Sequence, residues 1–177
     1  MAEPIRIDID DAELRALIDR LASAAAPGGL ATPFAEIGED LVDSTLRRFG
    51  TGTAPDGTPW APNSPATFAS WLSKRTGITR KDGRLNARGA ALAASKRPLI
   101  GDSLALSTQI FYQVEPDGLT VGSSRIYAAM MHFGGTRAEY PHLWGDIPAR
   151  PFLGISDADR VGIVEVLNRH LAGGVGA

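Results

Sequence analysis

The sequence has 177 residues, 44% of them hydrophobic, and its formal net charge is −2 at pH 7. This length suffices for one compact domain, and the absence of cysteine excludes disulfides, thiolate nucleophiles and cysteine-based zinc sites. No apolar run approaches the ~18 residues of a membrane span, and the opening residues, MAEPIRIDID, lack the pattern of a secretory signal. We therefore expect a single domain over residues 1–177, with its core at about 10–172, made in a reducing cytoplasm and without a membrane partner.

Two amphipathic helices are predicted in the first third of the chain. The first starts at Asp10, where a capping box is available, and ends before the turn at residues 27–29. The second has Thr32 as its N-cap, with a proline in its first turn, and Gly50 is placed to end it. Apolar residues recur with helical spacing in both segments, so each helix is expected to bury one face.

A loop and a short helix follow. Residues 50–60 read GTGTAPDGTPW, in which Pro55-Asp56-Gly57 is a tight-turn signature. Trp60 comes shortly after this turn, and we expect it to anchor the loop onto the core. Ser64 and Pro65 form an N-cap and first-turn pair, which predicts the start of the next helix.

A two-residue period replaces the helical one between Leu104 and Val114, which predicts a β-strand with one buried face. A turn at 116–118 and a return over 119–122 complete a hairpin. A small antiparallel β-sheet is therefore expected around residues 103–122.

Two helices are predicted in the last third of the chain. A short one covers residues 126–133, and a capping box of Ser156 and Asp159 starts the last one. The fold class that we expect is α+β, in which the small antiparallel sheet packs against the N- and C-terminal helices and long loops connect the elements.

Residues 74–97 form a strongly basic segment. They include eight basic residues and one acidic residue, a net charge of +7, so the rest of the chain sums to −9. Such a run indicates an exposed surface, either a docking surface or simply a solvated one. Its glycines argue against one long helix, so we expect some helix within a mobile loop. The basic residues are Lys74, Arg75, Arg80, Lys81, Arg84, Arg88, Lys96 and Arg97.

The stretch IPARPFL, residues 147–153, is called the strap below. Its two prolines fix their own φ angles and bias the preceding residues toward extended backbone, so the strap is stiff. Two interpretations are open. Phe152 and Leu153 either fill the core of their own subunit or dock on a neighbouring one.

Catalytic and metal-binding motifs are missing from the sequence. There is no HExxH pair, no GxSxG nucleophile elbow and no Walker loop, so we expect no enzyme, no cofactor and no metal. His132 lies on a short apolar helix, where a packed histidine that bonds a backbone group is the expected arrangement. A hydrolase that uses His132 is the rival hypothesis.

Four stretches in order resemble the phage virion morphogenesis (tail-completion) family of Mu-like phages. They are FGTGTAPDGTPWAP at 49–62, RPLIGDSLALST at 97–108, VGSSRIYAAMMHFGG at 121–135 and IPARPFLGISDAD at 147–159. The resemblance spans roughly residues 10 to 172. One departure lies in the second stretch, where Gly101-Asp102-Ser103-Leu104 separates the glycine and leucine by two residues rather than one.

The resemblance implies a structural, non-enzymatic protein of the virion neck or tail, present in the host cytoplasm during assembly. Such proteins assemble as rings, commonly six-fold, between the portal side of the capsid and the tail tube. The implied partners are further copies of this chain and the neighbouring neck, portal-side and tail proteins. Ring subunits need rigid docking elements, and the interface candidates are Trp60, Pro148, Arg150, Pro151, Phe152 and Leu153.

The basic segment has two candidate uses in a neck ring. Its cations would contact phosphates of the genomic DNA in the channel without sequence readout, or they would dock on an acidic neighbour. The candidate contact residues are Lys74, Arg75, Arg80, Lys81, Arg84 and Arg88. The alternative functions are a capsid-assembly factor and a non-specific nucleic-acid-binding protein that uses residues 74–97.

Overall fold

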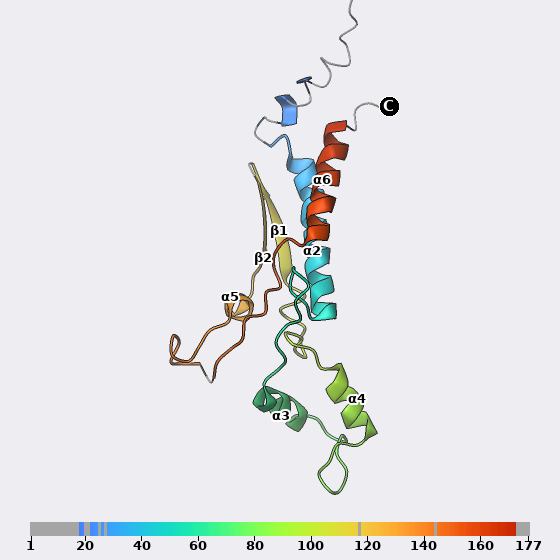
Figure 1. Cartoon of the computed structure of the whole chain (residues 1–177), viewed down its shortest axis with the longest axis vertical. Helices are drawn as coiled ribbons and strands as arrows, with labels where there is room; N and C mark the ends of the chain where they lie inside the picture. Colours follow the sequence, from blue (N-terminus) through green and yellow to red (C-terminus); the bar gives the residue numbers. More distant parts are fainter. Residues whose placement is uncertain are drawn as a thin grey trace, which may run out of the picture.

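The computed structural model describes residues 28–116, 118–143 and 145–172, together with residues 18, 19, 22–24 and 26. The start of the first predicted helix, at Asp10, lies outside the described residues. The labelled elements are α2 (Ala31–Thr51), α3 (Pro65–Ser73), α4 (Ala87–Ser95), β1 (Ile110–Glu115), β2 (Gly118–Ser123), α5 (Ala128–Phe133) and α6 (Asp157–Ala172) (Figure 1). The fold is α+β, as predicted.

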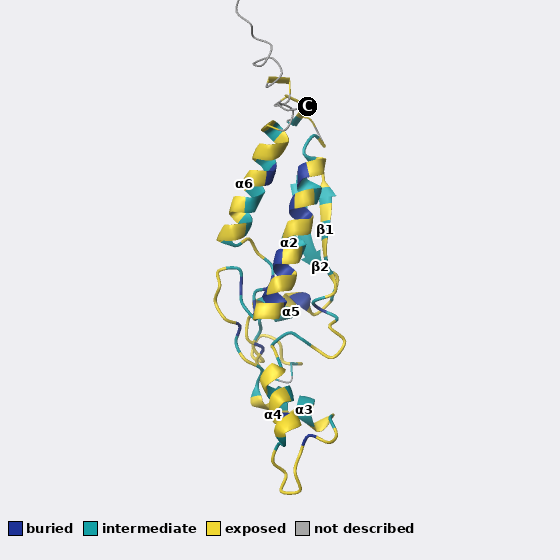
Figure 2. Cartoon of the chain, turned by 90° about the vertical axis from the view of Figure 1, so that its right-hand side faces the viewer, coloured by how far each residue is buried: buried dark blue, intermediate teal, exposed yellow. Residues whose placement is uncertain are grey.

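Helix α2 is the centre of the fold. It packs against α6 on one side and against β1 and β2 on the other, so the three layers lie side by side (Figure 2). The helix begins at Ala31, with Leu30 as an N-cap that makes no side-chain bond, so the prediction of Thr32 as the N-cap is wrong. Gly50 is inside the helix, and the end falls at Gly52, whose left-handed backbone (φ 75°) suits glycine and lets its N–H donate to the Arg48 carbonyl.

The predicted hairpin exists, but it is shorter than expected. β1 and β2 pair antiparallel, from Ile110 opposite Ser123 to Glu115 opposite Gly118. The burial alternates along β1 as predicted. The residues before it do not continue the strand, because Leu104 has a positive φ of 53° and its carbonyl accepts the N–H of Thr108 at 3.0 Å. A turn therefore occupies the segment in which the alternation predicted the first half of a strand.

The core lies near the C-terminal end of α2. It contains Phe49, Ala54, Trp60, Leu106, Ala128 and Phe152. The Phe49 ring packs edge-on against Trp60, with centroids 5.5 Å apart, and tilted against Phe152, with centroids 5.4 Å apart. Such aromatic pairs add to the free energy gained by burying their apolar area. Trp60 therefore anchors its loop onto the core, as predicted.

A buried ion pair joins α2 to α6. Arg48 and Asp159 approach to 2.5 Å, and their side chains are only 7% and 8% exposed. Burial raises the pKa of Asp159, but the hydrogen bonds from Ser44 and Ser156 and the charge of Arg48 outweigh it, so the net shift is downward. The Ser156–Asp159 capping box is confirmed, because the Ser156 N–H donates to the Asp159 carboxylate and the Asp159 N–H donates to the Ser156 hydroxyl.

Residues 64–97, called the arm below, project away from this body (Figure 1). Ser64 caps α3 as predicted, accepting the Thr67 N–H at 3.1 Å. No residue of α3 is buried, and Gly89 is the one buried residue of α4. The basic segment nevertheless has defined local structure: a bridge pairs Thr79 with Leu85, and α4 follows it. Local turns and a short helix thus occupy the basic segment, and its mobility stays a prediction.

Candidate functional site

The strap runs between α5 and the loop at residues 52–62, and both sides hold it by hydrogen bonds. The indole N–H of Trp60 donates to the Pro151 carbonyl at 2.8 Å. The Arg150 guanidinium donates to the carbonyls of Ala61 and Pro62, each at 2.8 Å. On the other side, the Arg150 N–H donates to the Met131 carbonyl at 3.1 Å. The strap therefore joins two segments that are distant in sequence.

Phe152 is the apolar anchor of the strap. Its side chain is 0% exposed, and its carbonyl accepts a bond from the buried Arg48 at 3.2 Å. The second of the two interpretations of the strap, docking through Phe152 on a neighbour, does not fit this position. Phe152 fills the core of its own subunit.

His132 holds the strap from α5. The backbone N–H groups of Phe152 and Leu153 point at its Nδ1 atom, at 3.3 and 3.5 Å, and its ring packs edge-on against Phe152. Burial lowers the pKa of His132, which favours the neutral ring that accepts these bonds. The packed histidine that the sequence predicted, bonded to a backbone group, is confirmed.

The predicted interface residues divide into two groups. Trp60, Arg150 and Phe152 are buried within the subunit, so their side chains stabilise the fold rather than form a free surface. Pro151 and Leu153 are half-buried, and Pro148 is exposed. An interface role for these three remains a prediction.

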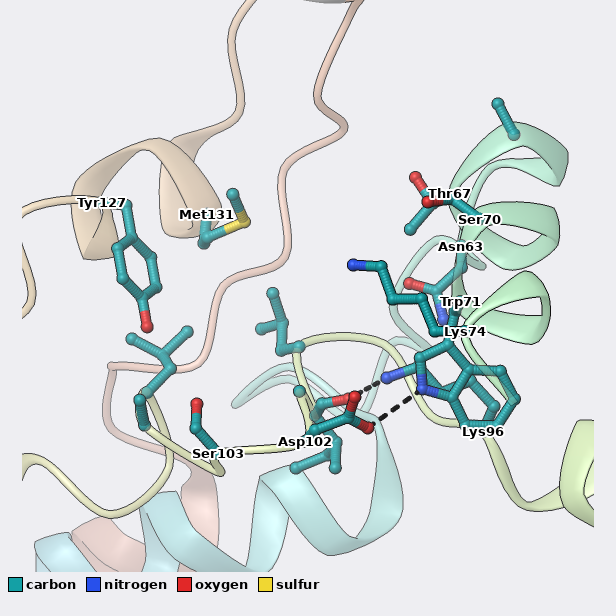
Figure 3. A pocket seen from close by; sticks show the side chains of 16 residues that line it. Asn63, Thr67, Ser70, Trp71, Lys74, Lys96, Asp102, Ser103, Tyr127 and Met131 are labelled. Atoms are coloured by element: carbon teal, nitrogen blue, oxygen red, sulfur yellow. Dashed lines mark hydrogen bonds between the residues drawn. The ribbon is translucent and has the colours of Figure 1, made fainter. Parts of the chain in front are cut away.

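A groove of about 560 Å³ lies between the arm and the body (Figure 3). Trp71 of α3 faces Asp102 across it, and the indole N–H donates to the Asp102 carboxylate at 3.3 Å. Arg75 lies over the Trp71 ring at 3.7 Å and pairs with Asp102 at 2.5 Å. These bonds, that of Arg75 first, lower the pKa of Asp102.

The groove separates the basic residues of the arm into two kinds. Arg75 and Lys96 hold the arm to the body, since Lys96 donates to the Ile100 carbonyl and its ammonium lies 5.2 Å from the Trp71 ring centre. The other basic residues are exposed: Lys74, Arg80, Lys81, Arg84, Arg88 and Arg97. Of the six predicted contact residues, Arg75 therefore makes its contacts within the subunit, and the other five are exposed to solvent.

Large apolar side chains are exposed on two different elements, and each pair is called an apolar face below. The first surrounds α5, where Ile126 is 100% and Phe133 is 76% exposed. The second follows α6, where Val161 and Val164 are more than half exposed and one helical turn apart. The two elements lie on different parts of the body (Figure 1). Apolar side chains that form a contiguous exposed patch are typical of interaction sites.

Comparison with protein families found that the model of the phage virion morphogenesis family matches residues 9–172. The chain belongs to the phage virion morphogenesis family. No curated protein and no solved structure matched it significantly. The match covers nearly the whole sequence, so the role of this virion morphogenesis protein lies in the assembly of the phage particle.

Two parts of the site in this virion morphogenesis protein escaped the sequence analysis. The apolar faces were missed because Ile126, Phe133, Val161 and Val164 stand in helical patterns that look the same whether a residue points inward or outward. The groove was missed because it depends on Asp102, which is 27 positions from its partner Arg75. The one feature of the sequence that pointed to the groove was a lone acidic residue, Asp102, after the basic segment.

The described part of this virion morphogenesis protein has neither a cluster of metal ligands nor a helix suited to a membrane. No group of three or more histidine, aspartate or glutamate side chains in that part is arranged to hold a metal ion. Within the same part, every helix is too short or too polar to cross a membrane.

Proposed function

We propose that this protein is a structural, non-enzymatic subunit that forms a ring at the head–tail neck and completes the tail so that it joins the capsid. The observation that carries the proposal is the pair of unlike apolar faces on α5 and α6. A subunit that associates through two different faces makes head-to-tail contacts, and such contacts generate a closed ring when the rotation between neighbours closes.

The strap supports this proposal through rigidity. It ties α5 to the loop at residues 52–62 and, through Phe152, to α2. The apolar face around α5 is therefore held at a defined angle to the face on α6. A fixed angle between two contact faces is what selects one ring size over an open filament, and preorganisation lowers the entropy lost on docking.

The proposal is tested with Phe133→Ser and Val164→Ser, each made separately. Both side chains are more than half exposed, so we expect each variant to keep the unfolding temperature of the parent protein and to lose self-association. Light scattering after size-exclusion chromatography reports the mass of the assembly. Arg137→Ser, at an exposed position of the loop at residues 136–146, is the control and should assemble normally.

The place in the particle is tested by electron microscopy of phage made with each variant. Loss of assembly should leave filled heads and free tails that do not join. A ring of this chain at the neck of intact particles is the expected positive result. Its absence from the mature particle would contradict the neck role and favour a transient capsid-assembly factor.

A further inference from the structure

Charge is distributed unevenly between the basic segment and the rest of the chain. The basic segment at 74–97 carries +7 and the remaining residues −9. The arm lies at one end of the long axis, and the N-terminal half of α2 lies toward the other (Figure 1). The arm thus carries a charge opposite in sign to that of the rest of the chain.

The tip of the arm is a built structure rather than a charged tail. Arg80 donates its N–H to the Arg84 carbonyl at 2.7 Å, and the Gly83 N–H closes the turn onto the Arg80 carbonyl at 3.1 Å. The Asp82 carboxylate accepts the Arg84 N–H at 3.1 Å. Three exposed cations, those of Arg80, Lys81 and Arg84, therefore stand on one short turn.

The opposite surface is an acidic row on α2. Glu36, Glu39, Asp40 and Asp43 line it, and their spacing of three and four residues places them along one side of the helix. Glu36 pairs with Arg169 of α6, and Glu39 accepts a weak bond from Tyr112. Among the described residues, no cation pairs with Asp40 or Asp43.

We propose that the tip of the arm docks on the acidic row of α2 in a second copy of this chain. The inference rests on the self-assembly in the proposed function and adds a charged contact to the apolar ones. A second copy fits better than DNA, because the −9 of the remaining residues repels phosphate and nearly cancels the charge of the arm. Because the two surfaces differ, the contact is head-to-tail, as a ring requires. It also steers the encounter between copies and weakens with salt.

Charge reversal tests the contact. One variant carries Arg80→Glu, Lys81→Glu and Arg84→Glu, and the other carries Asp40→Lys and Asp43→Lys. We expect each to self-associate at least about tenfold more weakly than the parent at low salt. An equimolar mixture should assemble again, because each reversed surface then meets a complementary one. Arg137→Glu, at an exposed position of the loop at residues 136–146, is the control for added negative charge and should assemble normally. Circular dichroism confirms that every variant is folded.

Cysteine cross-linking then identifies the contact directly, and the cysteine-free sequence gives no background. Copies with Lys81→Cys and copies with Asp43→Cys, distinguished by tags, are mixed and oxidised. Mixed disulfide-linked dimers are expected. Lys81→Cys paired with Thr120→Cys, on the exposed face of β2, should give none.

The outcomes separate this inference from the proposed function. If rings form without the mixed cross-link, and also form after the charge of the arm is reversed, the inference is overturned. The proposed function would not be affected by that result. Failure of the parent protein to assemble, both alone and in particles, would overturn both. Salt-dependent binding of duplex DNA that is lost in the arm variant, without any cross-link, would assign the arm to nucleic acid instead.

Discussion

Phe152 shows how one side chain organises this protein. It packs against Phe49 and His132, and its backbone carbonyl accepts a bond from Arg48. Arg48 is buried, and burying a cation is costly unless acceptors surround it. The Asp159 carboxylate, the Phe152 carbonyl and the hydroxyls of nearby α2 residues are those acceptors. The strap therefore completes a polar network and fills the core at the same point.

Truncation of Phe152 should destabilise the subunit strongly. We expect Phe152→Ala to lower the free energy of unfolding by about 3–5 kcal/mol, because it leaves a cavity in the core and loses the aromatic contacts. Urea unfolding followed by fluorescence measures this. Ala149→Ser, at an exposed strap position, should change it by less than about 0.5 kcal/mol. A Phe152→Ala protein that is fully stable but fails to assemble would show instead that Phe152 belongs to an interface between subunits.

His132 should make stability depend on pH. Burial lowers its pKa in the folded state below the ordinary 6.5, so the unfolded chain takes up the proton first as the pH falls. The contribution of His132 is therefore fully present above 6.5 and is lost progressively below it. Urea unfolding at about pH 7.5 and about pH 5.5 tests this. His132→Asn keeps an acceptor but does not titrate, so this variant should lose less stability between the two pH values than the parent protein. An equal loss would show that His132 is not the titrating group.

At the scale of the elements, glycines of α2 have opposite roles. Gly38 is buried under Tyr112 of β1, and a Cβ atom there would lie 2.4 Å from the ring. Gly50 is exposed, and a Cβ atom there would meet nothing within 4 Å. The hairpin thus packs directly on the backbone of α2, which explains why a two-stranded sheet, marginal by itself, is stable in this position.

This difference predicts opposite effects of one substitution. Gly38→Ala should lower the free energy of unfolding by about 1–3 kcal/mol, because the hairpin has to move away from α2. Gly50→Ala should raise it by about 0.5–1 kcal/mol, since alanine restricts the unfolded chain and favours helix. Thermal unfolding of the two variants measures both effects. Equal shifts of the same sign would show that Tyr112 does not pack on Gly38.

At the scale of the whole molecule, stability is concentrated in the body. α2 buries seven of its residues, whereas Gly89 is the one buried residue of α4. An element with few buried contacts opens at low free energy. The arm therefore combines an ordered fold with an accessible, charged surface.

Hydrogen exchange should show this difference. Amides of α4 are expected to exchange at least about tenfold faster than those in the middle of α2, because the arm opens without unfolding the body. Mass spectrometry of the exchanged protein measures both segments. In the assembled state, docking on a second copy should slow the exchange at residues 80–84. Equal protection of α2 and α4 in the free subunit would contradict the prediction.

The sequence by itself determined the features that depend on local chemistry. Local side chains explain the N-cap at Ser64, the capping box at Ser156 and the turn at 55–57. These side chains either bond the neighbouring backbone or fix the backbone angles. The α+β class and the alternation of β1 follow from periodicity, which reports the face that is buried. The motifs of the strap and of three other stretches also predicted the family.

Tertiary structure decided the features that depend on which surfaces meet. Trp60 and Arg150 bind partners that are about 90 positions distant in the chain, and no local pattern selects a distant partner. A strand was expected to start at Leu104, but the chain turns there and places Leu106 in the core. Packing of the whole molecule thus overrides the local alternation of the sequence. The outward direction of Ile126 and Phe133 was decided in the same way, because burial is a property of the packed molecule and periodicity specifies only that one face differs from another.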